Sequence, residues 1–301
     1  SIYMKECKSR VTNLSQLTDL PIQRQTMAKY FVSLLNTDRD FFDNYDGAEI
    51  IKVLKENPQL AAQQHIFEED CGHTYHAYPL HQAITVGANI DVVEAIYNCY
   101  PPAIKEKYEG GYTALHLAFF DDAPSDVALF IFGKWPKAAR EKDASGFLPL
   151  HYAMKSAVEV VSVILESWPS SAREKSNGQL TPLHYACIEC AQTEVVSLLL
   201  NSWPDAVREK DDLGYTPLHC SVSRSHISIE TVSLILGQYP GALRETTEGE
   251  DWTPLHIACR MNAPLQVMLM LLEPFPEAAR KKDSCGKTPL DIYVQYNPTS
   301  E

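Results

Sequence analysis

The sequence predicts an all-α solenoid in which about seven helix-turn-helix units stack side by side, the last one partial. The first observation is a Leu-His pair that recurs in steps of 35, 35, 33, 35, 37 and 35 residues, with Asp in place of His in the last copy. The second is the longer motif Thr-Pro-Leu-His, which occurs in full at 181–184, 216–219 and 253–256. The third is an apolar segment after each pair. A fixed period near 35 residues is typical of one supersecondary unit per repeat.

Each unit is expected to open with a short helix. Threonine is a favoured N-cap, because its hydroxyl accepts a backbone N–H of the first turn, and proline at the next position needs no hydrogen-bond acceptor. A second helix should follow, since segments such as 158–165 and 194–200 have the apolar spacing of an amphipathic helix. Neither helix is long enough to be stable alone, so stacking of neighbouring units must supply the core.

An aromatic-proline step is expected to end the second helix of each unit. A residue before proline is pushed out of helical geometry, and the proline can begin one further helical turn over the Pro-x-Ala-Ala-Arg-Glu-Lys pattern. We expect the rings to seal the junctions between units, so that alanine at Trp168 or Trp203 costs about 3–5 kcal/mol. The steps begin at Tyr100, Trp135, Trp168, Trp203, Tyr239 and Phe275.

The N-terminal part of the chain departs from the repeat. Residues 1–46 form an N-terminal segment with a predicted capping helix, because Ile22, Met27, Tyr30, Phe31 and the Leu34-Leu35 pair lie near one helical face. Residues 47–71 are predicted to be a degenerate half-repeat that keeps a second helix but no first helix. Residues 72–301 carry the repeats, the last one partial. Terminal units are commonly atypical because they must cover the apolar end of the stack.

Composition and charge narrow the class of partner. The 26 Lys and Arg against 39 Asp and Glu give a formal net charge of −13, which repels nucleic acid and anionic membranes. No apolar run is long enough to cross a bilayer. The eight cysteines are spread thinly, which indicates thiols in a reducing, intracellular compartment, with the cytoplasm expected. Organelle import stays open, because the chain starts at Ser1 and upstream residues could be missing.

These motifs resemble those of the ankyrin-repeat family, from roughly Gly72 to Asn297. The resemblance implies a unit made of a finger-like turn and two antiparallel helices, and a binding scaffold rather than a particular activity. One departure concerns the glycine that usually lies between the two helices, which survives only as Gly87. We expect the turns to differ where other residues stand there, at Asp122, Ala157, Cys190, Ser225 and Asn262.

Two periodic columns invite a structural interpretation. A base follows each aromatic by five residues and is itself followed by Glu in every copy but the last, as in Arg140-Glu141 and Arg173-Glu174. We expect stacking to set these acids beside the bases of neighbouring units as a solvated charge ladder. The histidines of the Leu-His pairs are expected to bond the backbone and the capping threonine, as structural groups at 81, 116, 151, 184, 219 and 256.

The candidate binding residues follow from the resemblance, because the finger position and the end of the first helix commonly line the concave face in this family. The finger column holds large rigid rings, which are favoured interface anchors, although packing between fingers is the other interpretation. Its members are Tyr112, Phe147, Leu180, Tyr215, Trp252 and Lys287. The residues at the ends of the first helices are Phe120-Asp121, Lys155-Ser156, Ile188-Glu189, Ser223-Arg224 and Arg260-Met261.

The sequence gives little support for a metal site, a bound cofactor or a catalytic activity. His65, Cys71, His73 and His76 form the densest group of zinc-type ligands, but their spacing matches no closed four-ligand motif and a polar finger loop explains it equally well. Cys187-x-x-Cys190 resembles a redox half-motif, but small buried packing is the better account. No glycine-rich phosphate loop or nucleophile motif is present, so we expect no cofactor and no enzyme.

The sequence therefore predicts a non-catalytic scaffold or adaptor that binds another polypeptide on its concave face. The acidic surface favours a partner with a basic patch. An alternative is a targeting or regulatory module of a larger enzyme or ubiquitin-ligase complex.

Overall fold

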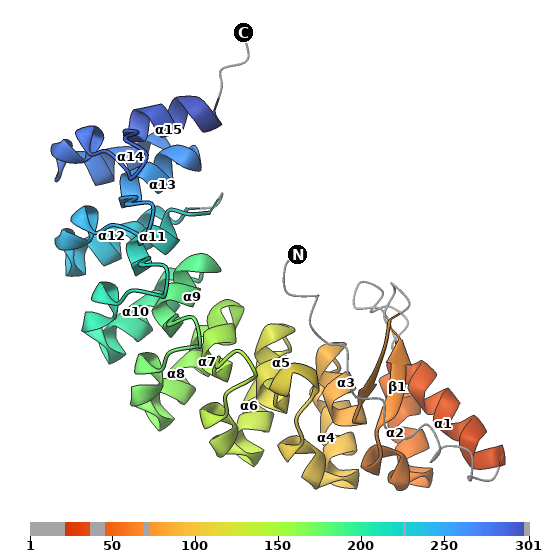
Figure 1. Ribbon diagram of the computed structural model, residues 1–301. Coiled ribbons are helices and arrows are strands. Elements are labelled where there is room, and N and C mark those ends of the chain that lie inside the picture. The colour runs from red at the N-terminus through yellow and green to blue at the C-terminus, as the bar shows by residue number, and fades with distance from the viewer. Residues whose placement is uncertain (1–21, 37–45, 69–72, 225–226, 298–301) are drawn as a thin grey trace.

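The computed structural model describes residues 22–36, 46–68, 73–224 and 227–297. Within them the chain is a curved stack of helix pairs that runs from one end of the molecule to the other (Figure 1). The predicted all-α solenoid is confirmed. None of the helices in these ranges is long and apolar enough to span a lipid bilayer.

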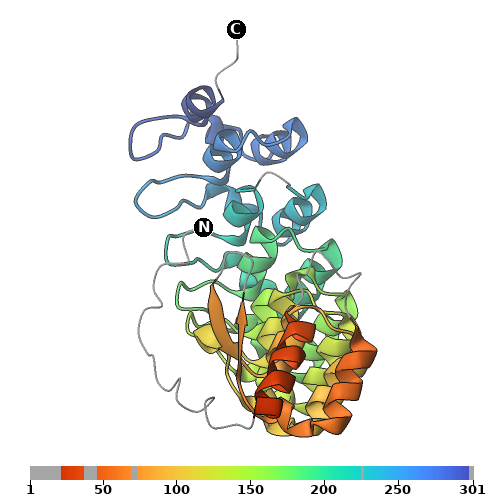
Figure 2. The ribbon, with the colours of Figure 1, turned by 90° about the vertical axis from the view of Figure 1, so that its right-hand side faces the viewer.

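Each unit contributes a first helix to the inner side of the curve and a second helix to the outer side (Figure 1). The first helices are α3 (Pro79–Thr85), α5 (Ala114–Phe120), α7 (Pro149–Tyr152), α9 (Pro182–Ile188), α11 (Pro217–Ser221), α13 (Pro254–Arg260) and α15 (Pro289–Tyr296). The second helices are α4 (Ile90–Cys99), α6 (Ser125–Lys134), α8 (Val158–Ser167), α10 (Thr193–Ser202), α12 (Ile229–Gln238) and α14 (Leu265–Leu272). Figure 2 shows the loops between units as fingers that project to one side of the helices.

The N-terminal end is closed by α1 (Ile22–Leu35), which packs against α2 (Gly47–Glu56), α3 and β1. Phe31 and Leu35 of this helix are fully buried, whereas Tyr30 is 43% exposed and lies off the packed face. A 3-10 turn, η3 (Pro58–Ala62), follows α2, and then come the antiparallel strands β1 (His65–Glu68) and β2 (Thr74–Ala77). The boundaries predicted at residues 46/47 and 71/72 remain predictions.

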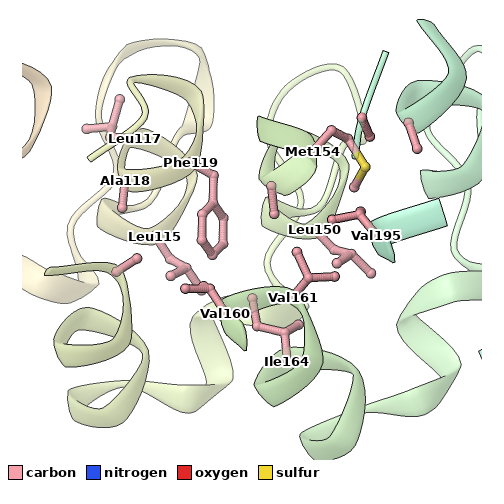
Figure 3. Close-up of a cluster of buried hydrophobic side chains, with 14 of the residues drawn as sticks. Leu115, Leu117, Ala118, Phe119, Leu150, Met154, Val160, Val161, Ile164 and Val195 are labelled. Atoms are coloured by element: carbon pink, nitrogen blue, oxygen red, sulfur yellow. The ribbon is translucent and has the colours of Figure 1, made fainter. Parts of the chain in front are cut away.

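The core runs continuously through the junctions between units. Figure 3 shows Leu115 and Phe119 of α5 pointing toward Val160 of α8, and Leu150 of α7 lying near Val161 and Ile164. All six of these side chains are at most 2% exposed. Because short helices cannot hold themselves together, this shared apolar layer is what stabilises each of them.

The aromatic-proline step ends the second helices as predicted and begins an extra 3-10 turn in every complete unit. In α10, for example, Trp203 is the C-cap and its N–H donates to the Leu199 carbonyl. Only α14 ends earlier, at Leu272, ahead of Pro274. The extra turns are η4 (Pro101–Lys105), η6 (Pro136–Arg140), η8 (Pro169–Arg173), η9 (Pro204–Arg208), η10 (Pro240–Arg244) and η11 (Pro276–Arg280). A shorter turn, η5 (Glu109–Gly111), lies in the first finger, and η7 (Ala153–Lys155) follows α7.

The predicted charge ladder exists, but its cation is lysine and not arginine. A lysine of one unit pairs with the Glu of the next, at N–O distances between 2.7 and 3.1 Å. The pairs are Lys107–Glu141, Lys142–Glu174, Lys175–Glu209 and Lys210–Glu245. The side chains are partly exposed, so each pair contributes about 0–1 kcal/mol.

The arginine column instead covers the aromatic column of the following unit. Its guanidinium carbons lie between 4.3 and 5.9 Å from the ring centroids, within reach of a cation–π interaction. The pairs are Arg140–Trp168, Arg173–Trp203, Arg208–Tyr239 and Arg244–Phe275. The expectation of an Arg–Glu ladder is therefore wrong: the guanidinium lies over a ring of the next unit, and the lysine two residues later in the chain pairs with the acid.

The turns between the two helices of a unit are less varied than expected. Asp122, Cys190 and Asn262 adopt φ values of 48°, 53° and 52°, close to the left-handed geometry of Gly87. The prediction that these three turns differ is therefore wrong. Ala157 does differ, with φ of −59° after the additional turn η7, and Ser225 lies outside the described residues.

One finger carries a glutamine where its neighbours carry glycine. Gln179 has φ of 59° and takes the place of Gly146, Gly214 and Gly286, whose φ values are 76–78°. Left-handed backbone costs a residue with a side chain roughly 1–2 kcal/mol, partly offset by the greater flexibility of unfolded glycine. Gln179→Gly is therefore expected to raise the free energy of unfolding by about 0.5–1 kcal/mol, measured by chemical denaturation.

The reverse change at a neighbouring finger is the matched control. A Cβ added at Gly146 would lie 2.8 Å from the Asn177 backbone nitrogen, so Gly146→Gln should destabilise the array. Equal stability of wild type and Gln179→Gly would show that this finger carries no backbone strain.

Candidate binding site

The repeat histidines hold the start of each first helix. In α9 the Thr181 N–H donates to His184 Nδ1 at 3.2 Å, the threonine hydroxyl lies 2.7 Å from the same nitrogen, and the His184 N–H donates back to that hydroxyl. The same reciprocal cap recurs at Thr113, Thr216 and Thr253. The structural role predicted for these histidines is confirmed there. At His151 the backbone N–H of Leu148 replaces the threonine contacts.

The second ring nitrogen connects neighbouring units. Because Nδ1 accepts a backbone hydrogen bond, the ring proton is on Nε2, which donates to the carbonyl of the next finger residue. His116 Nε2 reaches the Phe147 carbonyl at 3.1 Å, and His184 Nε2 reaches that of Tyr215 at 3.1 Å. The finger column is thereby fixed through its backbone, whereas the exposure of its side chains differs from unit to unit.

Five rings gather at the first helices and fingers of three successive units. We call this set the concave aromatic cluster: Tyr112, Phe120, Phe147, Tyr152 and Tyr185. Ring centroids of neighbours lie 5.4–5.9 Å apart in tilted or edge-on contact, the range in which aromatic pairs attract each other. Phe120 is 58% exposed and the other four rings are half-buried.

The cluster is held in place by hydrogen bonds beneath it. The Tyr152 hydroxyl donates to Asp143 Oδ2 at 2.7 Å, and the other oxygen of that carboxylate accepts the N–H groups of Ser145 and Phe147. Burial, followed by the contact with Asp143, raises the pKa of Tyr152 well above its ordinary value. The hydroxyl therefore stays protonated, and the ring is fixed before any ligand arrives.

The predicted binding residues divide into those that the fold brings together and those that it does not. Tyr112, Phe120 and Phe147 belong to the cluster, and Asp121 follows Phe120 at its edge. Lys155 pairs with Glu189 at 3.3 Å, and Ile188 is half-buried beside that pair. Three members lie farther along the stack, at Tyr215, Arg224 and Met261.

Trp252 is not the exposed anchor that the sequence suggested. It is only 6% exposed, and its indole N–H donates to Asp283 Oδ2 of the next finger at 3.1 Å. The Arg260 guanidinium covers its ring at 5.2 Å and that of Tyr296 at 5.3 Å. At this finger the other interpretation, packing between fingers, is therefore the right one, and Arg260 is occupied by the same contact.

Sequence reasoning missed Tyr152 and Tyr185. Both directly follow the histidine of the repeat, a position held elsewhere by Gln82, Leu117, Cys220 and Ile257. The signal was available, because only two adjacent copies read Leu-His-Tyr. The resemblance pointed to the finger column and to the ends of the first helices, and this position lies between the two.

Packing accounts for two of the cysteine and histidine candidates for other chemistry, His65 and Cys187, whereas His73, His76 and Cys190 are exposed, so the expectation of buried packing is wrong for Cys190. His65 is buried, and its Nε2 lies 2.8 Å from the Leu60 carbonyl between the rings of Phe31 and Phe67. Cys71 lies outside the described residues, within which no group of three His, Cys, Asp or Glu side chains is placed to hold a metal ion. Burial raises the pKa of the Cys187 thiol, which makes it a packing residue.

Comparison with known proteins agrees with this architecture. A family model described as ankyrin repeats in three copies matches residues 121–209 and 169–243, and a single ankyrin-repeat model matches residues 250–280. No curated protein matches the sequence. Among solved structures, the ankyrin repeat domain of Bcl-3, titled a unique member of the IkappaB protein family, aligns with a TM-score of 0.53 at 23% identity. That alignment covers 71% of this chain and 92% of the Bcl-3 domain, and at this identity it shows the fold alone.

The segments that the two family models match together span just over half of the sequence. The chain therefore belongs to the ankyrin-repeat family, whose arrays are protein–protein interaction modules.

Proposed function

We propose that this chain is a non-catalytic scaffold that holds a segment of a partner protein against the concave aromatic cluster. The observation that carries the proposal is the contact of five rings from three successive units, with Phe120 more than half exposed. Soluble proteins seldom leave a connected apolar surface on rigid elements without a use for it.

The physical basis is pre-organisation. Aromatic side chains offer large contact areas while losing little conformational entropy on binding, and these rings are already fixed by one another and by Asp143. Asp121 and the Lys155–Glu189 pair provide a polar rim, which is the usual arrangement around an apolar hot spot. The net charge of −13 favours a partner with a basic patch, chiefly through the rate of encounter.

The test compares two aromatic deletions on opposite sides of the array. Phe120→Ser with Tyr185→Ser removes two rings of the cluster, whereas Phe130→Ser removes a half-buried ring of α6 that pairs with Tyr97 of α4. Affinity purification with quantitative mass spectrometry should show partners lost by about tenfold or more from the first variant and retained by the control. Circular dichroism checks that both variants fold. Retention of all partners by the double variant would place the binding surface elsewhere.

A further inference from the structure

Helix α15, the last helix among the described residues, exposes positions that are buried in every earlier unit. Leu290 and Val294 of α15 are 66% and 64% exposed. The equivalents of Leu290 are 0–3% exposed, and they are Leu80, Leu115, Leu150, Leu183, Leu218 and Leu255. The equivalents of Val294 are 0–8% exposed, and they are Ile84, Phe119, Met154, Cys187, Val222 and Cys259. Ala279 is exposed as well, although its equivalents, such as Ala139 and Val207, are buried.

Two cations border this apolar surface. Arg280 occupies the register of Arg173, which covers Trp203, and Lys282 that of Lys175, which pairs with Glu209 at 2.7 Å. Trp203 is the C-cap of the second helix α10, and Glu209 is the C-cap of the 3-10 turn η9 that follows it. Arg280 and Lys282 are exposed, and within the described ranges neither has the ring or the carboxylate that its inner counterparts have. We call Ala279, Arg280, Lys282, Leu290 and Val294 the end face.

The turn that follows the first helix in the inner units has a different backbone at Asn297, the last residue that the structure describes. Asn297 occupies the register of Gly87, Asp122, Cys190 and Asn262, whose φ values of 48–74° send the chain into the following helix. Asn297 instead has φ of −126°, and its side chain donates to the carbonyls of Cys259 and Tyr293. The end face therefore has the apolar and cationic groups that hold a second helix in the inner units, and Asn297 lacks the left-handed backbone that leads into one there. Figure 1 shows α15 at the end of the stack opposite α1.

This unit lacks the hydrogen-bond donor that holds the next finger in earlier units. Asp291 replaces the repeat histidine and still caps Thr288, at 2.8 Å to the backbone nitrogen. The hydrogen bonds from Thr288 lower the pKa of its carboxyl group, so it is ionised. It cannot donate a hydrogen bond to the carbonyl of a next finger, as His184 does.

We propose that the end face docks an amphipathic helix of a partner protein, with an apolar stripe on Leu290 and Val294 and a carboxylate on Lys282. The site has the geometry of an inner second-helix position, in which α10 lies on α9 with Trp203 under Arg173 and Glu209 beside Lys175. A second copy of this chain fits poorly, because a symmetric contact would bring Arg280 and Lys282 of both copies together.

The inner junction supplies a direct probe. A fluorescent peptide with the sequence of residues 193–210 carries the apolar stripe, Trp203 and Glu209, and a lactam between its positions 197 and 201 holds it helical. We expect fluorescence anisotropy to show binding to the full chain with Kd on the order of 10–100 μM. Leu290→Glu with Val294→Glu should weaken it at least about tenfold, and these exposed positions leave the fold intact. Phe120→Ser, at the concave aromatic cluster, should leave it unchanged.

A charge exchange tests the polar contact. Lys282→Glu in the chain should weaken binding of the wild-type peptide. A peptide that carries Glu209→Lys should bind this variant chain again. The proposal fails if the peptide does not bind, or if it binds equally well to the Leu290→Glu, Val294→Glu chain. A wild-type dimer in light scattering that the same two substitutions dissociate would assign the face to a second copy and overturn it as well.

Discussion

Lowering the pH from about 7 to about 5 is expected to unfold the array, because its repeat histidines are buried in the neutral form. Burial holds the pKa of each near 4 at His81, His116, His151, His184 and His219. Burial lowers the pKa of His256 too. In the unfolded chain the same groups titrate near about 6.5.

The sign follows from which state binds the proton. Between the folded value near 4 and the unfolded value, the unfolded chain takes up protons that the folded chain refuses, so stability falls as the pH falls. Above about pH 6.5 the stabilisation is fully present. Across this range each histidine lowers the free energy of unfolding by about 1.4 kcal/mol for every pH unit. Five of them together lower it by on the order of 7 kcal/mol per pH unit. That is comparable with the whole stability of a typical domain.

The measurement is the free energy of unfolding by urea, followed by circular dichroism at several pH values. His219→Gln, which removes one titrating group, should be less stable at neutral pH. Its free energy of unfolding should also depend less steeply on pH, by about one proton. A free energy that stays constant between about pH 7 and pH 5 would contradict the neutral, buried assignment of these rings.

The repeated motifs were enough to predict the fold, because every copy repeats the same local chemistry. Thr-Pro at a helix start and an aromatic before proline at a helix end act within a few residues of the chain, so their effect can be deduced without knowing the neighbours. The predicted helix starts at Pro182 and Pro254 and the extra turns after Trp168 and Trp203 are all present. The same locality explains why the structural role of the histidines was predictable.

The candidate site was harder to predict, because exposure depends on what the adjacent unit contributes. Tyr215 and Trp252 hold the same register, yet Trp252 is buried because the next finger supplies Asp283 as an acceptor and Arg260 covers the ring. Conversely, Tyr152 and Tyr185 join the site through contacts with the rings of neighbouring fingers. A column in the sequence shows which positions are equivalent and leaves open which of them remain uncovered.

The charge columns illustrate a second limit. The sequence placed Arg, Glu and Lys in successive positions, and several pairings across a junction were compatible with that order. Which cation meets the acid depends on the direction of each side chain and on the ring that lies opposite. In the structure Arg173 stacks on Trp203 and Lys175 reaches Glu209, so one junction has two separate contacts.

Trp203→Ala is expected to destabilise the array by about 2–3 kcal/mol, less than the loss expected for a fully buried ring. The indole is half-buried, packs against the core where α10 ends, and is covered by Arg173 at 5.9 Å. Removing it loses apolar burial on one side and the cation–π contact on the other. Because each unit is stabilised only by its neighbours, the loss should weaken the junctions on both sides of α10. Urea denaturation of the full chain measures the change in unfolding free energy.

A double-mutant cycle with Arg173→Ala separates the two contributions. Arg173→Ala alone should cost about 0.5–1 kcal/mol, and it should have almost no further effect once Trp203 is absent, since its ring partner is gone. The Lys175–Glu209 pair is untouched by either change and keeps the register of the junction. A cost of Trp203→Ala near zero would mean that the apolar layer formed by the helices stabilises the junction without the ring. Additive effects in the cycle would mean that the guanidinium and the indole do not interact, and that the arginine column serves solubility instead.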